Sequence, residues 1–187
     1  MPTVEENRLQ SFHNIVKDYI AYKLRQHNIF LAGYHENSSP SAAACHLRRV
    51  ADELIEENSQ LFDSMCDQLH LTHATTYSTF VGIADEIFQS GKNWGRIVAF
   101  LAFGATLAVY CAQKEDLAQN IDNIVEWLSV YMDQNLSGWI DDNGGWDGFI
   151  AFFKRDDGSS ESGRSGGWRV AAVAGLGLGA LLMLACR

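Results

Sequence analysis

Four consecutive residues, Asn93, Trp94, Gly95 and Arg96, open an uncharged run that extends from 97 to 112. Asparagine is a favoured N-cap, so Asn93 predicts a helix that begins at the next residue. Gly95 leaves the first helical turn without a side chain, so a partner backbone can come close. Arg96, at the rim of an apolar surface, can bind a partner carboxylate through two parallel hydrogen bonds. This combination suits peptide recognition better than catalysis. The alternative is that these residues only cap a core helix and form a surface ion pair.

Residue types used in catalysis or metal binding form no convincing group. The six histidines have no identifiable nucleophile or paired carboxylate around them, which argues against an enzyme. Cys66, His70 and His73 have the i, i+4, i+7 spacing of one helical face, but they lack the fourth ligand of a structural zinc site. Residues 141–144 lack the ligand spacing of a calcium loop and are interpreted as the cap of the last helix. We expect no metal and no cofactor.

The charge balance limits the class of partner. The 187-residue chain carries a formal net charge of -9, which argues against nucleic acid as a ligand and favours a basic partner surface. Its hydrophobic share of 47% is enough for one sizeable core, so we expect one bundle domain over residues 1–153. The four cysteines form no Cys-x-x-Cys pair, which indicates a reducing compartment. The first residues have no basic stretch followed by an apolar one, so we expect no secretory signal.

The C-terminal segment has a different composition. Residues 170–186 carry no charge and have an arginine on either side, which predicts a membrane-spanning helix at the short end of the range. Such a length suits a thin intracellular membrane. We therefore expect a polar linker over residues 154–167 and a membrane anchor over residues 168–187. Small residues recur every four positions within the anchor, and they would let two such helices pack into a homo- or heterodimer.

Hydrophobic residues between the termini repeat with a helical period almost throughout, and only Pro2 and Pro40 interrupt the chain. This pattern predicts an all-α bundle. Residues 97–112 are apolar on every side, and sixteen residues are few for a membrane span, so we expect this helix at the centre of the bundle. Helices are predicted at about 5–26, 41–54, 61–69, 75–89, 94–113, 117–136 and 146–153.

Four stretches resemble the homology regions of the Bcl-2 family of apoptosis regulators. Residues 93–96 resemble the first region, and residues 139–147, Trp-Ile-Asp-Asp-Asn-Gly-Gly-Trp-Asp, resemble the second. Residues 47–54 resemble the third region, with Ala51 where the family usually has glycine. Residues 15–24 resemble the fourth region of the pro-survival members. The resemblance implies a Bcl-2-like helical bundle around the central hydrophobic helix, followed by a C-terminal transmembrane tail helix.

The resemblance also implies a binding site. Pro-survival members hold a hydrophobic groove beside the central helix, and the groove takes an amphipathic helix from a pro-death relative, here called the death-motif helix. Arg96 would pair with the aspartate of that ligand, Asn93 would hydrogen-bond near it, and Gly95 would admit its small residue. By the same resemblance, the apolar pockets of the groove would be formed by Leu54, Phe62, Met65, Phe80, Ile83, Ile87, Val98, Ala99, Phe103 and Phe153.

Three functions are compatible with these features. The first is a pro-survival regulator, tail-anchored in the mitochondrial outer membrane or the endoplasmic reticulum with its bundle in the cytosol, that neutralises relatives such as Bax, Bak and their activators. The second is a pore-forming effector of the Bax and Bak kind. The sequence of residues 16–24 is closer to the pro-survival branch. The third is a tail-anchored helical adaptor with no role in cell death, which leaves the four ordered regions unexplained.

Overall fold

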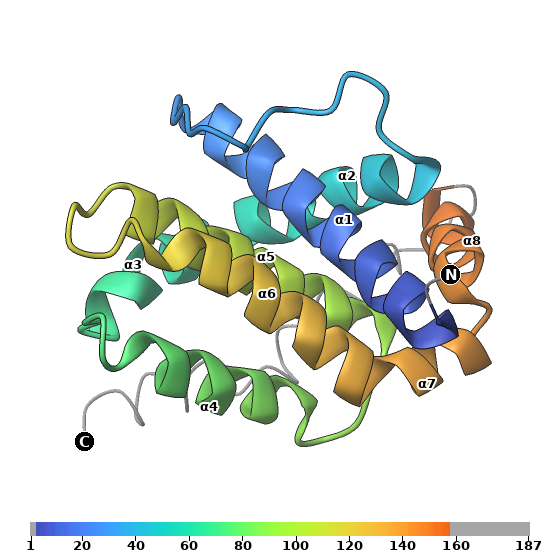
Figure 1. Ribbon diagram of the computed structural model, residues 1–187. Coiled ribbons are helices and arrows are strands. Elements are labelled where there is room, and N and C mark those ends of the chain that lie inside the picture. Colours follow the sequence, from blue (N-terminus) through green and yellow to red (C-terminus); the bar gives the residue numbers. More distant parts are fainter. Residues whose placement is uncertain (1–2, 158–187) are drawn as a thin grey trace.

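The computed structural model describes residues 3–157, and the regular structure in that part of the chain is helical apart from one isolated β-bridge between Leu31 and Tyr34 (Figure 1). The all-α prediction is therefore confirmed. In chain order the helices are α1 (Val4–Gln26), α2 (Ala42–Glu57), α3 (Ser59–Gln68), α4 (Thr76–Phe88), α5 (Trp94–Ala112), α6 (Asn120–Tyr131), a π-helical segment (Met132–Leu136), α7 (Ser137–Asp142) and α8 (Gly145–Asp157).

Helix α5 forms the centre of the bundle, as the sequence predicts. It packs against α1, α2, α3, α4 and α6, and its residues from Ile97 to Ala105 are all buried. A Cβ atom on Gly104 would lie 2.5 Å from a methyl carbon of Leu128, so the missing side chain lets α5 and α6 approach closely. Within the described residues, α5 is the one helix long and apolar enough to cross a membrane, and 83% of that stretch is buried in the bundle.

The segment between α6 and α8 differs from the predicted single helix over residues 117–136. Residues 117–119 form turns, α6 ends at Tyr131, and a π-helical segment leads into α7. The Nε atom of Arg8 in α1 lies 2.7 Å from a carboxylate oxygen of Asp133, which ties the π-helical segment to the start of the chain. This contact joins residues 125 positions apart, so the hydrophobic period of residues 117–136 alone does not predict where α6 ends.

Of residues 141–144, which the sequence assigns to the cap of the last helix, Gly144 alone has that place: it precedes α8, and its carbonyl oxygen accepts a hydrogen bond from the backbone N–H of Gly148 at 2.9 Å. Asp141 and Asp142 are the last residues of α7, and Asn143 is its C-cap. Gly144 and Gly145 follow with φ angles of +83° and +60°, which glycine adopts without strain, and α8 begins there. Helix α8 continues to residue 157, so the first residues of the predicted linker are helical. The rest of the linker and the predicted anchor at 168–187 lie outside the described residues.

Candidate functional site

The first turn of α5 has the capped geometry that its sequence predicts. Asn93 has the extended backbone of an N-cap, with φ of -157° and ψ of 166°. Its side-chain oxygen accepts a hydrogen bond from the backbone N–H of Arg96 at 2.8 Å. The cap satisfies one of the free N–H groups at the helix start and fixes where the helix begins. Trp94, Gly95 and Arg96 are all buried in this turn.

The side chain of Arg96 is buried, although the sequence places it at the rim of an apolar surface. Only 8% of the residue is exposed, and one of its terminal nitrogens donates a hydrogen bond to the carbonyl oxygen of Gly91 at 2.6 Å. Gly91 has a φ angle of +107°, a conformation that glycine adopts most easily. The Nε atom of Arg96 is buried and meets no acceptor in the described part of the protein. Within the described residues, the guanidinium thus keeps a buried nitrogen without an acceptor.

The ten apolar residues expected to form the groove lie in one continuous hydrophobic cluster around α5. Each of them is at most 5% exposed, so a ligand helix reaches them only through a change of conformation. They come from five helices, with Leu54 on α2, Phe62 and Met65 on α3, Phe80, Ile83 and Ile87 on α4, Val98, Ala99 and Phe103 on α5, and Phe153 on α8.

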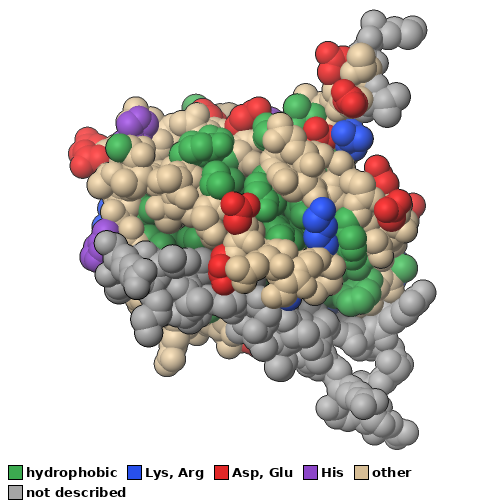
Figure 2. Space-filling model, turned by 90° about the horizontal axis from the view of Figure 1, so that it is seen from below, with side chains coloured by type: hydrophobic (Ala, Val, Ile, Leu, Met, Phe, Trp, Pro, Cys, Tyr) green, Lys and Arg blue, Asp and Glu red, His purple; other side chains and the backbone are tan. Residues whose placement is uncertain are grey.

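Aromatic contacts hold α4 against α5 and α6. The Phe80 ring stacks on Phe103 with centroids 6.2 Å apart, and it also contacts Phe100 at 5.8 Å and Trp127 at 5.7 Å. Tyr77, one turn before Phe80, contacts Trp127 at 5.0 Å yet is 56% exposed. Seen from below α4, hydrophobic side chains reach the surface in a band across the molecule (Figure 2). Helix α4 therefore joins the buried cluster to an apolar surface.

Aromatic rings gather around Trp94 at the start of α5. The site residues predicted from the sequence do not include this cluster. Trp94 contacts Trp139 at 5.0 Å, Phe149 at 5.5 Å and Trp146 at 6.5 Å. A Cβ atom on Gly148 would lie 1.9 Å from the carbonyl oxygen of Asn143, so this position requires glycine. The tryptophans at 94, 139 and 146 are the sequence signal that could have revealed the cluster. The aromatic cluster packs α8 against the first turn of α5, which carries Arg96.

The metal-like spacing of Cys66, His70 and His73 does not form a site. Helix α3 ends at Gln68, and His70 has a φ angle of +45°, so the three residues do not share one helical face. Nδ1 of His73 lies 3.0 Å from the side-chain oxygen of Asn120 in α6. Burial raises the pKa of the Cys66 thiol to about 12, which opposes the thiolate form that binds metals. Residues 3–157 contain no group of three His, Cys, Asp or Glu placed to hold a metal ion.

Comparison with known proteins identifies the family. Residues 47–146, more than half of the chain, match the family model described as apoptosis regulator proteins, Bcl-2 family. The chain belongs to the Bcl-2 family. It is 36% identical over 176 residues to apoptosis regulator R1 of Xenopus laevis, an alignment that covers 90% of this chain and 74% of the relative. It is 39% identical over 120 residues to apoptosis regulator Bcl-2 of Gallus gallus, covering 63% of this chain and 51% of the relative.

A solved structure has the same Bcl-2-like fold. The crystal structure of Trichoplax adhaerens trBcl-2L2 bound to trBak BH3 superposes with a TM-score of 0.73 at 34% sequence identity. The superposition covers 78% of this chain and 99% of that one. The all-helical Bcl-2-like architecture around the central apolar helix is therefore established for this member of the family.

Proposed function

We propose that this chain is a pro-survival regulator that binds the death-motif helices of pro-apoptotic relatives in a groove beside α5. By doing so it blocks permeabilisation of the mitochondrial outer membrane. The observation that carries the proposal is the likeness, at 34% identity, to trBcl-2L2 in the crystal structure in which that protein is bound to trBak BH3. The likeness to the relative named apoptosis regulator Bcl-2 supports the same branch of the family.

The start of α5 supplies the polar part of this recognition. A death-motif helix needs apolar pockets for residues at i, i+3, i+4 and i+7, together with one polar group that sets its register. The Nε atom of Arg96 is a charged donor without an acceptor, and a ligand carboxylate would satisfy it. Asn93 stands exposed beside it, and its amide nitrogen can donate to the same carboxylate. The apolar residues of the groove lie next to this turn in one cluster.

Burial of those apolar residues makes the proposal more specific. A ligand helix must gain access to side chains that are at most 5% exposed. Binding that depends on such a change has an association rate below the usual range of about 10⁵ to 10⁷ M⁻¹s⁻¹ for protein partners. The predicted tail anchor would hold the bundle at an intracellular membrane, the mitochondrial outer membrane or the endoplasmic reticulum, where these partners act.

A panel of synthetic death-motif peptides tests the proposal on the full-length protein. We expect at least one peptide to bind with sub-micromolar affinity, and we expect isolated mitochondria that receive the protein to resist permeabilisation by an activated effector. Failure of every peptide, with helical content and a cooperative unfolding transition showing that the protein is folded, would contradict the proposal. Permeabilisation of mitochondria by the protein alone would favour the effector function instead.

A further inference from the structure

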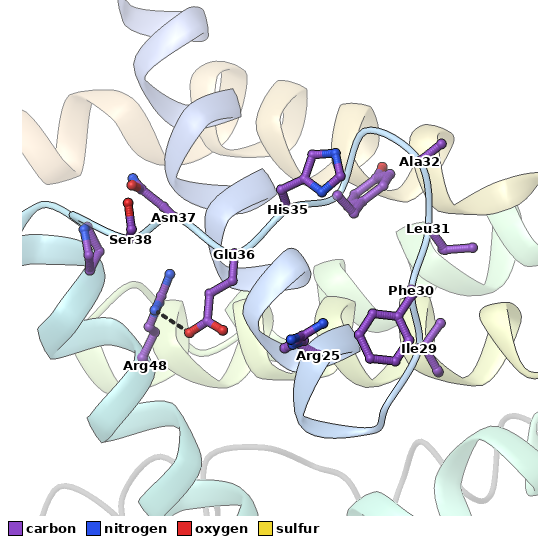
Figure 3. Close-up of a pocket in the computed structure, with 12 residues that line it drawn as sticks. Arg25, Ile29, Phe30, Leu31, Ala32, His35, Glu36, Asn37, Ser38 and Arg48 are labelled. Carbon is purple, nitrogen blue, oxygen red and sulfur yellow. Dashed lines mark hydrogen bonds and ion pairs between the residues drawn. The ribbon is translucent and has the colours of Figure 1, made fainter.

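A hollow lies away from the proposed groove, beneath the loop that joins α1 to α2. It has a volume of about 830 Å³ and is bordered by the end of α1, the loop and Arg48 of α2 (Figure 3). This volume is within the range of about 300 to 1,000 Å³ that ligand-binding pockets occupy. None of the residues assigned to the groove lines it. We call this hollow the loop cleft.

One arm of the loop is held against the bundle. The backbone N–H of Ile29 donates to the carbonyl oxygen of Leu24 at 2.9 Å, and that of Tyr34 donates to Leu31 at 3.1 Å. The hydroxyl of Tyr34 donates to a carboxylate oxygen of Asp122 in α6 at 2.7 Å. These contacts fix the part of the loop that carries the apolar lining of the cleft. A fixed loop loses less conformational entropy when a ligand binds.

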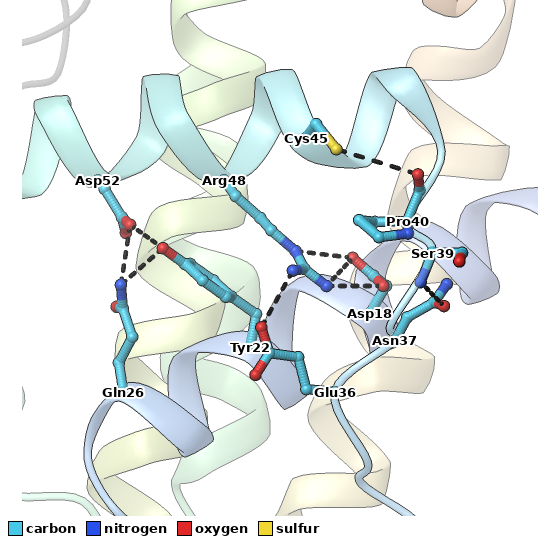
Figure 4. Close-up of polar contacts among 10 residues, drawn as sticks. All are labelled: Asp18, Tyr22, Gln26, Glu36, Asn37, Ser39, Pro40, Cys45, Arg48 and Asp52. Carbon is cyan, nitrogen blue, oxygen red and sulfur yellow. Dashed lines mark hydrogen bonds and ion pairs between the residues drawn. The ribbon is translucent and has the colours of Figure 1, made fainter.

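The other arm is held by Arg48 (Figure 4). Its guanidinium donates to both carboxylate oxygens of Asp18 at 3.0 to 3.2 Å and to Glu36 of the loop at 3.4 Å. One guanidinium faces two carboxylates, so the three side chains together carry a net charge of -1. Arg48 is therefore not the cation that a ligand would meet.

Arg25 differs from Arg48 because it has no carboxylate partner within residues 3–157, the part of the chain that the structure describes. Its guanidinium carbon lies 4.4 Å from the centroid of the Phe30 ring, and Phe30 is 68% exposed. An arginine at this distance from a ring face is attracted to it, and the guanidinium can still donate hydrogen bonds from its edge. In Figure 3 the two side chains lie together at the mouth of the cleft. A pre-positioned cation and an exposed aromatic ring thus stand side by side in a chain of net charge -9.

We propose that the loop cleft binds an extended peptide segment that carries carboxylates next to an aromatic side chain. Arg25 binds a carboxylate, and Phe30 packs against the aromatic side chain of the ligand. Ile29 and Leu31 supply further apolar contact on the same arm. The cleft is open on one side. An extended ligand chain can therefore enter the cleft, cross it and leave. The partner is therefore a protein with an acidic, aromatic linear segment, and it binds independently of a helix in the groove.

A short synthetic peptide tests this site directly. The probe is the capped pentapeptide Gly-Glu-Phe-Glu-Gly, titrated into isotope-labelled full-length protein while the backbone amide signals are recorded by NMR. We expect saturable shifts at Arg25, Phe30 and Leu31, and an affinity about tenfold lower for Gly-Gln-Phe-Gln-Gly because the carboxylates are lost. The peptide Gly-Glu-Ala-Glu-Gly should also bind several-fold more weakly. Shifts at other surfaces, or equal binding of the glutamine peptide, would overturn the proposal.

Matched variants separate the site from general charge effects. Arg25→Gln and Phe30→Ala should each weaken the probe by about fivefold or more. Lys114→Gln removes an equal charge from another cation–ring pair, in which Nζ lies 5.0 Å from the Tyr110 centroid, and it should leave the probe affinity unchanged. Death-motif peptides should bind Arg25→Gln as tightly as they bind the wild type. If no death-motif peptide binds the wild type, only the proposed function is contradicted. If Lys114→Gln weakens binding of the probe as much as Arg25→Gln does, the loop-cleft proposal is overturned.

Discussion

Arg96 combines two properties that seldom occur together. It is a permanently charged side chain that is 8% exposed, and its Nε donor has no acceptor in the described part of the bundle. A buried donor left without a partner costs about 1 to 3 kcal/mol, and more when the group is charged. The hydrogen bond to Gly91 offsets only part of that cost. In the proposed function, a ligand carboxylate would remove the rest of that cost.

Gly148 offers a test of the packing beneath that residue. Gly148→Ala should lower the free energy of unfolding by about 2 to 3 kcal/mol, because its Cβ atom would overlap the carbonyl oxygen of Asn143 and the backbone must shift. Gly138→Ala is the matched control, since a Cβ atom there meets nothing within 4 Å. It should be neutral or stabilising by up to about 1 kcal/mol. Urea unfolding measures both, and equal effects would show that the turn before α8 is not tightly packed.

At the scale of elements, the attachment of α1 to α2 is polar as well as apolar. Arg48 and Asp18 bridge the two helices with side chains that are 11% and 10% exposed. Asp52 of α2 accepts a hydrogen bond from the Tyr22 hydroxyl at 2.5 Å (Figure 4). It accepts another from Lys23 at 2.8 Å. Burial and, to a smaller extent, hydrogen bonding to Asp52 raise the pKa of the Tyr22 hydroxyl, so it stays protonated as the donor. These contacts hold the helix that resembles the third homology region against α1.

The ion pair between Arg48 and Asp18 should contribute more to the stability of the fold than the more exposed ion pair between Arg48 and Glu36. Asp18→Asn should lower the free energy of unfolding by about 2 to 4 kcal/mol, because it leaves a largely buried guanidinium without its main counter-charge. Glu36→Gln removes a carboxylate from the same guanidinium, but that side chain is 43% exposed and should cost less than about 1 kcal/mol. Chemical denaturation compares the two. A larger loss in Glu36→Gln would reverse our assignment of the stabilising partner.

Helix periodicity predicted the elements whose environment is uniform along their length. Helix α5 is apolar on every side and is buried on every side, so pattern and position agree. The positions at which helices are interrupted were not predicted. His70 adopts a left-handed backbone that non-glycine residues seldom use, and it ends the helical face on which the metal-like spacing depended. The π-helical segment is stabilised by Arg8, which is 125 positions away from Asp133 in the sequence.

The sequence likewise predicted only part of the candidate site. The N-cap role of Asn93 follows from its residue type and the apolar run after it, and the structure confirms it. The burial of Arg96 depends on where the carbonyl of Gly91 points, and that direction is set by a loop conformation which no pattern encodes. The aromatic cluster around Trp94 brings together residues from α5, α7 and α8. Its members are visible in the sequence, but their convergence is a property of the fold.

At the scale of the whole molecule, we propose two parts: a bundle that recognises helices and a tail that holds the bundle at a membrane. Removing residues 168–187 should release the protein into the cytosol without abolishing peptide binding, because the proposed groove is built from residues 54–153. Cell fractionation and peptide titration measure the two properties on the same variant. A truncated protein that stayed on membranes would assign the anchoring to α5, whose length and composition also allow it to cross a bilayer.

A double-mutant cycle between Arg96 and the aspartate of a bound death-motif peptide tests the central claim most directly. Arg96→Ala should weaken the peptide by about 2 to 5 kcal/mol, because the ligand aspartate would be left desolvated and unpaired. The variant also loses the hydrogen bond to Gly91, so its folded fraction is measured alongside. Replacing the ligand aspartate by alanine should weaken binding to the wild type but add little to the loss in Arg96→Ala. Losses that simply add would show that Arg96 does not meet that carboxylate, and would contradict the groove as assigned.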